Sequence, residues 1–211
     1  MPRAAEPVPA GPKFTRDLPE ARRRQLIDAT ARCFARHGLA GTSVRTVAAE
    51  AGVSAGLVRH HFEGMHRLVA ETYRSTGKEI AAVIAAALEA AGADPEARLR
   101  AFIDANLRPP LLDPERLAVW LAFWSLARSD AEIRRIHARI YREYRRMIEE
   151  MVDALATAHK RTLDSRRAAL HLVALLDGLW LEHCLDAETF DATEAAAIAH
   201  RWVDGLKLGH A

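Results

Sequence analysis

The chain has 211 residues, of which 50% are hydrophobic and 27% charged, the balance of a globular protein rather than a disordered one. Its formal net charge is +2, only 6% of its residues are aromatic, and its two cysteines, Cys33 and Cys184, are far apart. This excludes a disulfide framework and a Cys-x-x-Cys metal site. Alanine accounts for 42 residues, which together with many Leu, Arg and Glu favours helix along most of the chain.

The first residues of the chain are rich in proline. Met1 to Pro12 contains four prolines and no apolar segment, so we expect a flexible tail over 1–17 rather than a signal peptide. The longest uncharged apolar stretches, such as Ile80 to Leu88, are too short to cross a bilayer. We therefore expect a cytoplasmic protein without a membrane partner.

The pattern of apolar residues and helix breakers predicts about nine helices and no strand. In chain order, the predicted helices cover 18–37, 43–50, 54–62, 64–91, 95–108, 113–128, 131–159, 164–185 and 191–208. Glycines and prolines separate them, such as Gly38 and the Pro109-Pro110 pair. The predicted fold is all-α, with a three-helix domain over 18–63 and a larger helical domain over 64–211.

The small net charge is unevenly distributed. Residues 1–62 contain ten Lys and Arg against five Asp and Glu, whereas residues 63–211 contain twenty against twenty-three. A basic N-terminal part suits a polyanion partner, although a solvated surface would show the same imbalance.

Residues 42–62 have the spacing of a helix-turn-helix, with two short helices about Gly52 and the small Ala48 four residues earlier. A small residue at 48 lets the two helices approach each other, and Gly52 can adopt the positive φ of a tight turn. Apolar side chains would hold the second helix at a fixed angle: Val47, Val53, Val58 and Phe62. Such a corner also occurs in proteins that do not bind DNA, and the basic charge of 1–62 favours the DNA-binding alternative.

The outward side of this motif carries residues that suit the major groove of DNA. Arg59 can donate two hydrogen bonds to guanine, and Ala55 and Leu57 can contact thymine methyl groups. Free N–H groups at the helix starts suit phosphate oxygens. The DNA-binding candidates are Ser43, Arg45, Ser54, Ala55, Gly56, Leu57, Arg59, His60 and His61.

The segment Arg22 to Phe62, and above all Ala51-Gly52-Val53-Ser54-Ala55-Gly56 with His61-Phe62, resembles the DNA-binding domain of TetR-family regulators. The resemblance implies a homodimeric repressor whose N-terminal domains bind a palindromic operator. It also implies that the C-terminal helices form a ligand pocket and a dimer interface.

Two positions depart from the family's pattern. Arg59 stands where a tyrosine is common, which indicates a different base preference. Met65 stands where a lysine commonly contacts phosphate, and His66 or Arg67 could compensate for it.

Three further segments, 22–30, 120–124 and 175–181, resemble the BetI-type branch, the choline-responsive repressors of glycine-betaine synthesis. This resemblance implies choline or a related quaternary ammonium compound as effector and choline-to-betaine genes as targets. Because the similar segments are short, a TetR-like regulator of another pathway, with a more hydrophobic effector, is the alternative.

Three of the four tryptophans lie in two of these segments, where they could form an aromatic cage. Aromatic faces bind quaternary ammonium groups with roughly 0.5–2 kcal/mol per contact, often beside a carboxylate, here Asp177 or Glu182. The ligand-binding candidates are Trp120, Phe123, Trp124, Asp177 and Trp180. The alternative is that the tryptophans are ordinary core residues.

The last two predicted helices, 164–185 and 191–208, carry small and apolar residues that predict a dimer interface of two helices from each subunit. The predicted contact residues are Ala168, Ala169, Leu172, Leu176, Gly178 and Leu179 on the first and Ala195, Ile198, Ala199, Trp202, Val203 and Leu206 on the second. Packing within the same chain is the alternative.

The sequence contains none of the usual spacings for metal or nucleophile chemistry, such as HExxH, a Walker loop or GxSxG. A helical enzyme acting on a small molecule is therefore disfavoured, and we predict no catalytic residue, cofactor or metal site. The expected partners are double-stranded DNA, a small-molecule effector and a second copy of the chain.

Overall fold

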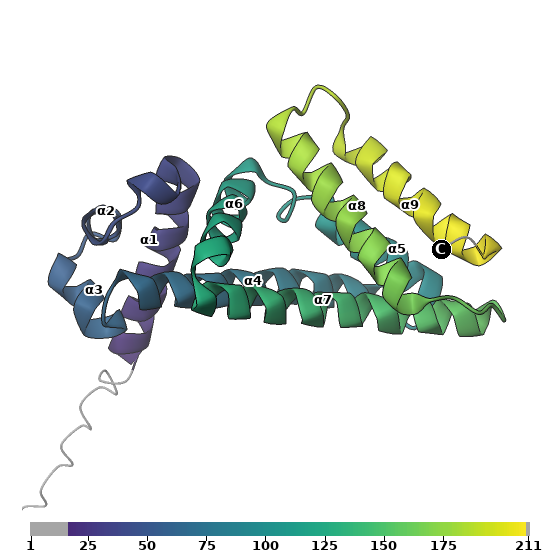
Figure 1. Ribbon diagram of the computed structural model, residues 1–211, viewed down its shortest axis with the longest axis horizontal. Helices are drawn as coiled ribbons and strands as arrows, with labels where there is room; N and C mark the ends of the chain where they lie inside the picture. Colours follow the sequence, from purple (N-terminus) through teal and green to yellow (C-terminus); the bar gives the residue numbers. More distant parts are fainter. Residues whose placement is uncertain (1–16, 210–211) are drawn as a thin grey trace, which may run out of the picture.

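The computed structural model describes residues 17–209, and all nine predicted helices are present in that part of the chain (Figure 1). They are α1 (Asp17–Gly41), α2 (Val44–Glu50), α3 (Ala55–Phe62), α4 (Met65–Ala90), α5 (Pro95–Asn106), α6 (Pro114–Ser129), α7 (Ala131–Ala158), α8 (Ser165–Leu185) and α9 (Ala192–Leu208). No strand occurs between residues 17 and 209, which confirms the all-α prediction. The predicted tail over 1–17 lies outside the described residues, apart from Asp17, which begins α1.

The end of α1 differs from the prediction. The sequence predicts an end at Gly38, and Gly38 does leave the helical conformation, with φ at 61°. One further turn follows through Gly41, so the helix is kinked there rather than ended. The Thr42 hydroxyl donates a hydrogen bond to the Gly38 carbonyl oxygen at 2.7 Å, which stabilises the turn between α1 and α2.

Aspartate side chains begin the helices of the C-terminal part after α4. Each accepts a hydrogen bond from a backbone N–H of the first turn, a donor that the helix itself leaves without a partner. These residues are Asp94, Asp113, Asp130, Asp164 and Asp191, which precede α5, α6, α7, α8 and α9. The helix starts are therefore determined locally by sequence.

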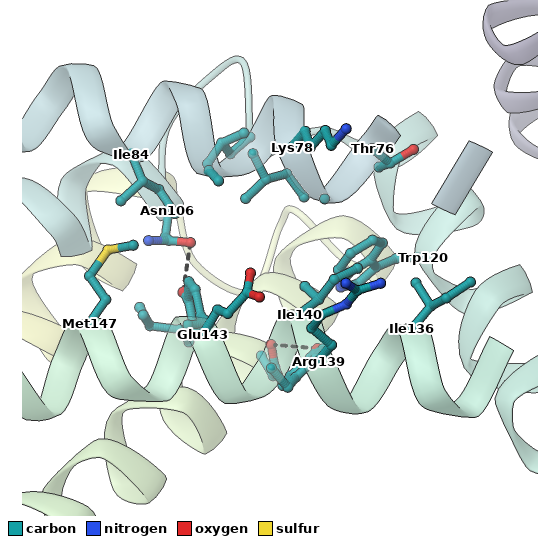
Figure 2. Close-up of a pocket in the computed structure, with 18 of the residues that line it drawn as sticks. Thr76, Lys78, Ile84, Asn106, Trp120, Ile136, Arg139, Ile140, Glu143 and Met147 are labelled. Carbon is teal, nitrogen blue, oxygen red and sulfur yellow. Dashed lines mark hydrogen bonds between the residues drawn. The ribbon is translucent and has the colours of Figure 1, made fainter. Parts of the chain in front are cut away.

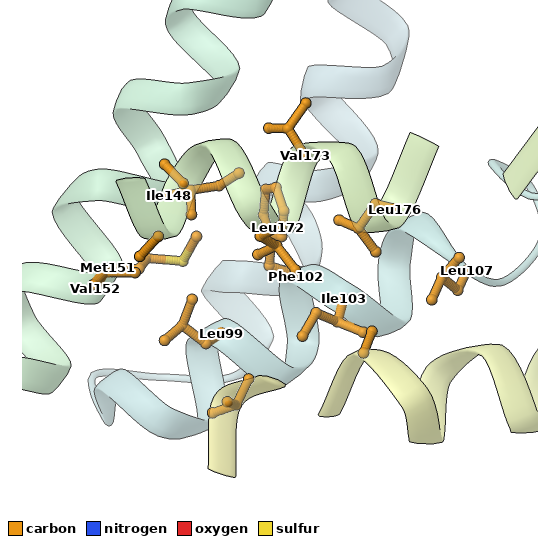
Figure 3. Close-up of a cluster of buried hydrophobic side chains, with 14 of the residues drawn as sticks. Leu99, Phe102, Ile103, Leu107, Ile148, Met151, Val152, Leu172, Val173 and Leu176 are labelled. Atoms are coloured by element: carbon orange, nitrogen blue, oxygen red, sulfur yellow. The ribbon is translucent and has the colours of Figure 1, made fainter. Parts of the chain in front are cut away.

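Three buried clusters hold the helices together. The first lies in the helix-turn-helix and is formed by Leu26, Ala29, Cys33, Val47, Ala48, Ala51, Val58, Phe62 and Leu68. The second joins α1, α4, α6 and α7 around Tyr73 and Phe123. The third joins α4, α5, α7, α8 and α9 (Figure 3). The helix α4 contributes to all three, through Leu68, Tyr73 and Ile84 in turn.

The two longest helices of the C-terminal part, α4 and α7, run side by side along the molecule (Figure 1). The helices α1, α2 and α3 lie at one end of this pair, and α5, α8 and α9 lie at the other, with α6 between them (Figure 1). Because only Glu63 and Gly64 separate the end of α3 from the start of α4, any movement of α4 carries the end of α3 with it.

The predicted dimer contact residues lie largely inside their own chain. Ala168, Ala169, Leu172 and Leu176 of α8 and Ala195, Ala199, Val203 and Leu206 of α9 all belong to the third cluster. The reason is that each helix has apolar residues on two faces, and one face packs within the chain: α8 against α7, and α9 against α5. Apolar side chains remain exposed on the other face, including Leu170 (40%), Leu185 (67%) and Ile198 (37%), beside the exposed Ala174 and Gly178.

Within the described residues one helix, α8, is long and apolar enough to cross a membrane when only length and composition are considered. A single such helix is weak evidence for a membrane span. Its exposed apolar face equally suits contact with another protein subunit.

We expect Gly52→Ala to lower the free energy of unfolding by about 1–2 kcal/mol, the cost of a left-handed conformation for an L-residue. Gly52 has φ at 63°, and an added Cβ would meet no atom within 4 Å, so this cost is conformational and not steric. The measurement is urea denaturation followed by circular dichroism.

The matched control is Gly56→Ala, in the first turn of α3, where φ is not positive and an added Cβ makes only an ordinary 3.8 Å contact with Ser54 Oγ. We expect it to raise stability by up to about 1 kcal/mol. Equal effects of the two substitutions would contradict a special requirement for glycine at residue 52.

Candidate DNA-binding surface and effector cavity

The turn between α2 and α3 has the geometry that the sequence predicts. The Gly52 N–H donates to the Ala49 carbonyl oxygen at 3.1 Å, and the Val53 N–H donates to the Ala48 carbonyl oxygen at 2.9 Å. Ala48 is buried where the two helices approach. The positive φ of Gly52 and the small side chain of Ala48 together allow this tight turn.

The helix α1 holds α2 and α3 in place from behind. The Gln25 amide donates to the Ala51 carbonyl oxygen at 2.6 Å, at the end of α2. The Arg23 guanidinium donates to the His61 carbonyl oxygen and lies 4.3 Å from the centre of the Phe62 ring, at the end of α3. The orientation of the two short helices is therefore coupled to the position of α1.

The nine DNA-binding candidates lie in α2, in α3 or directly before these helices. Seven are exposed, and Leu57 and His61 are half-buried. The Ser43 hydroxyl accepts a hydrogen bond from the Thr46 N–H at 3.2 Å and so caps α2. Ser54 precedes α3 but its side chain makes no capping hydrogen bond; the Leu57 N–H donates to the Ser54 carbonyl oxygen at 3.0 Å, and the N–H groups of Ala55 and Gly56 are open to phosphate oxygens.

Met65, which stands where the family commonly has a lysine, and the two residues after it all contact other parts of the protein. Met65 packs between the first and second clusters. His66 Nε2 lies 2.7 Å from Asp130 Oδ2, and Arg67 Nη1 lies 3.6 Å from Glu132 Oε1, both at the start of α7. Either side chain would have to leave its carboxylate to contact a phosphate, and both pairs join the start of α4 to α7.

A cavity of about 650 Å³ lies between α4 and α7 and extends to α6 and α8 (Figure 2). Of the predicted ligand-binding residues, Trp120, Asp177 and Trp180 line it. Phe123 does not, because its fully buried ring stacks on Tyr73 with the ring centroids 4.1 Å apart. Trp124 is half-buried at the edge of the second cluster and does not line the cavity either.

Two tyrosines of α7 also line the cavity, although the sequence interpretation did not single them out. The Tyr144 hydroxyl donates to Asn106 Oδ1 at 2.8 Å, and the Tyr141 hydroxyl donates to Asp177 Oδ2 at 3.3 Å. The chain has only three tyrosines, and these two lie three residues apart on one helix. This spacing, which places both tyrosines on one face of a predicted helix, is the feature of the sequence that could have identified them.

Asp177 is the distinctive group of this cavity. No Lys, Arg or His nitrogen of the described residues lies within 4.0 Å of its carboxylate. Burial raises the pKa of Asp177 to about 6, and the hydrogen bond from Tyr141 acts in the opposite direction. Nearby, the Trp180 indole donates to the Leu111 carbonyl oxygen at 3.2 Å, which fixes the orientation of its ring. A partly desolvated carboxylate among aromatic rings is suited to an organic cation.

Two protein-family models match the chain. Residues 26–72 match the model of bacterial regulatory proteins of the tetR family, and residues 95–207 match the C-terminal model of BetI-type transcriptional repressors. Among curated proteins, the HTH-type transcriptional regulator BetI of Burkholderia thailandensis is 37% identical over 188 residues, which cover 89% of this chain and 94% of the relative. The BetI regulator of Paraburkholderia xenovorans is 37% identical over 186 residues, which cover 88% and 93%.

Solved structures are similar over most of their length. A structure from Pseudomonas aeruginosa PAO1, described as a transcriptional regulator, superimposes with a TM-score of 0.85 at 42% identity and covers 93% of this chain and 95% of that one. A regulator structure from Saccharomonospora viridis in complex with choline has a TM-score of 0.79 at 22% identity and covers 88% and 96%. At that identity, the second likeness shows the shared fold alone.

We expect Arg59→Ala to weaken binding to the preferred DNA sequence by about 5- to 150-fold, the loss that a bidentate guanine contact of about 1–3 kcal/mol predicts. The preferred sequence can be selected from random duplexes, and affinities measured by fluorescence anisotropy at fixed salt. The loss should be confined to one base position, since the variant no longer distinguishes guanine there.

The control is Arg161→Ala, which removes the same charge from an exposed position between α7 and α8, at the opposite end of α7 from the helix-turn-helix. Its affinity for DNA should equal that of the wild type. An Arg59→Ala variant that kept the wild-type ranking of every single-base change would remove Arg59 from base recognition.

Proposed function

Because this chain belongs to the TetR family of DNA-binding transcriptional regulators, in its BetI-type branch, we propose that choline or a related quaternary ammonium compound is its effector. The regulated genes would be those that convert choline to glycine betaine, and the operator would be a palindrome. Membership of this family makes the protein a regulator and not an enzyme.

The observation that carries this proposal is the half-buried carboxylate of Asp177. It faces a cavity whose aromatic lining includes Trp120, Trp180, Tyr141 and Tyr144, and no cationic nitrogen of residues 17–209 lies within 4.0 Å of it. A quaternary ammonium group cannot donate a conventional hydrogen bond, so aromatic faces and one carboxylate are the partners it needs. The choline bound in the Saccharomonospora viridis regulator supports the same class of ligand. A more hydrophobic effector would leave Asp177 without a partner.

A chain of contacts joins Asp177 to α4. The Tyr141 hydroxyl donates to Asp177, and the Tyr141 ring lies with its centroid 4.4 Å from that of His137. His137 Nδ1 in turn lies 2.8 Å from the Tyr73 hydroxyl of α4. A cation that draws Asp177 toward itself would therefore act on the Tyr141 hydrogen bond, and through His137 on the position of α4.

The same chain of contacts continues to the DNA-binding surface. Tyr73 stacks on Phe123 of α6, and the Phe123 ring meets the edge of Phe34 in α1 at 5.6 Å between centroids. Gln25 of α1 then holds Ala51 at the end of α2. An effector that binds the conformation unsuited to DNA 100-fold more tightly supplies about 2.7 kcal/mol to release the operator.

A homodimer through α8 and α9 is the second part of the proposal. The exposed face of α8 carries Leu170, Ala174, Gly178 and Leu185, and α9 adds Ile198. An apolar surface of this kind is typical of a subunit interface, and the small residues allow close approach of two helices. Two copies would place two α3 helices on one DNA duplex, as a palindromic operator requires.

The proposed functions belong to successive parts of the chain. We assign DNA binding to residues 18–63 and effector binding and dimerisation to 64–211. DNA, an effector and a second subunit are then the partners, and a cytoplasmic location follows from access to the chromosome.

We expect calorimetric titration with choline to show binding that weakens as the pH falls. Choline requires the ionised carboxylate, and with a pKa of about 6 only about a tenth of Asp177 is ionised at pH 5. Affinity should therefore be about tenfold lower at pH 5 than at pH 8, and constant above pH 8. Asp177→Asn should remove most of the affinity and the pH dependence together.

The control for this titration is Glu182→Gln, which removes an exposed carboxylate from the same helix but outside the cavity. It should bind choline as the wild type does. Asp177→Asn should remain folded, because it replaces a carboxylate whose ionisation burial already disfavours. Wild-type choline affinity in a folded Asp177→Asn variant would refute the cation site.

We expect Ala174→Glu to convert the dimer to a monomer, because it would place a like charge from each subunit in an apolar interface. Ala154→Glu, at an exposed position of α7, is the matched control and should leave the assembly unchanged. Sedimentation equilibrium distinguishes the 23.3 kDa chain from its dimer. A wild-type protein that sediments as a monomer at all concentrations would contradict the interface.

A further inference from the structure

A second cavity, of about 570 Å³, adjoins the effector cavity between the first halves of α4 and α7. Arg74, Ile136 and Arg139 line both cavities, so the two share a wall. The remaining residues of the second cavity are Arg67, Glu132, Arg135 and Arg142. Five of its seven lining residues are therefore arginines, against one carboxylate.

The single carboxylate does not neutralise these arginines. Glu132 is shared by Arg74, at 2.9 Å, and Arg67, at 3.6 Å, and Arg74 also pairs with Glu71 at 2.9 Å, outside the cavity lining. Within residues 17–209, Arg135, Arg139 and Arg142 have no carboxylate oxygen within 4.0 Å. The cavity thus has a large excess of positive charge, which an anion of more than one charge would balance.

The arrangement of the arginines is regular. Arg135, Arg139 and Arg142 lie at i, i+4 and i+7 on α7 and so share one face of that helix. They span seven residues, or roughly 10 Å along the helix axis. Arg67 and Arg74 are two turns apart on α4 and line the same cavity from the other side. Guanidinium groups that converge from two helices can each offer a pair of N–H donors to one phosphate group.

The two cavities differ in their charged lining: the effector cavity contains carboxylates as well as bases, whereas the second cavity contains five arginines and one carboxylate. Among residues 17–209, Asp177 in the effector cavity has no cationic nitrogen within 4.0 Å, and Arg135, Arg139 and Arg142 in the second cavity have no carboxylate oxygen within 4.0 Å. Arg139 lies on their common wall, and Figure 2 shows its side chain reaching from α7 toward α4 beside Trp120. A ligand with a cationic and an anionic end could therefore bind both cavities at once.

We propose that the second cavity is a phosphate-binding subsite of the effector site, and that a phosphorylated quaternary ammonium compound binds the protein more tightly than choline does. This subsite extends the proposed cation site and relies on it for the cationic end. A phosphate suits the cavity better than a carboxylate, because three unpaired guanidinium groups exceed what one carboxylate can neutralise. The effector cavity, at about 650 Å³, has the volume of a typical small-molecule site and so has room for the quaternary ammonium end of such a compound.

The test compares phosphocholine, choline, glycine betaine and inorganic phosphate by calorimetry on the full-length protein. The variant is Arg135→Gln/Arg142→Gln, since these two residues line the second cavity only. The matched control is Arg166→Gln/Arg167→Gln, which removes the same charge from the exposed first turn of α8. Circular dichroism establishes that each variant is folded.

We expect wild-type protein to bind phosphocholine at least tenfold more tightly than choline or glycine betaine. In Arg135→Gln/Arg142→Gln the phosphocholine affinity should fall to that of choline, while choline binding is unchanged. Inorganic phosphate should bind the wild type and the control variant but not the cavity variant. These results together would establish the subsite.

Failure of the subsite and failure of the choline proposal have different signatures. Choline binding with no gain from phosphate overturns the subsite and leaves the cation site standing. Phosphate binding that the cavity variant loses, without any choline binding, overturns the cation site and supports the subsite. Reduced operator affinity in the cavity variant, with unchanged phosphate and phosphocholine binding, assigns the arginines to DNA and overturns the subsite.

Discussion

The structure depends on the packing of one helix, α4, in three separate buried clusters. Leu68 anchors its start in the helix-turn-helix, Tyr73 anchors it against α1 and α6, and Ile84 anchors its far end in the core of α5, α7, α8 and α9. Because a helix is stiff over this length, a displacement at one cluster is transmitted to the others. The DNA-binding surface and the effector cavity are therefore constrained by the same element.

In the effector cavity, the carboxylate of Asp177 has no cationic nitrogen of the described residues within 4.0 Å. A carboxylate shielded from water ordinarily has a cationic partner or several hydrogen-bond donors, and within residues 17–209 only the Tyr141 hydroxyl donates to the half-buried Asp177. An effector that supplies the missing charge would stabilise the conformation in which it fits best. The arginines of the adjoining cavity present the opposite requirement, so the two cavities together favour a ligand with two charges of opposite sign.

The sequence was most informative where a backbone conformation or a helix period determines the outcome. Gly52, Ala48 and the spacing of the apolar residues around them predicted the helix-turn-helix, and capping residues and prolines predicted most helix ends. Side-chain direction was harder to predict, since Trp120, Phe123 and Trp124 share a helix face but only Trp120 reaches the cavity. The arginine-lined cavity was not predictable, because it requires α4 and α7 to be brought side by side.

The central claim is that a cation bound at Asp177 lowers the affinity of α3 for the operator, and that a bound operator lowers the affinity of Asp177 for the cation. The most direct measurement is the affinity of choline for the free protein and for the operator-bound protein. The operator should lower the affinity for choline by the same factor by which saturating choline lowers the affinity for the operator, because such coupling is reciprocal. An equal affinity for choline in the presence and absence of operator would contradict the claim.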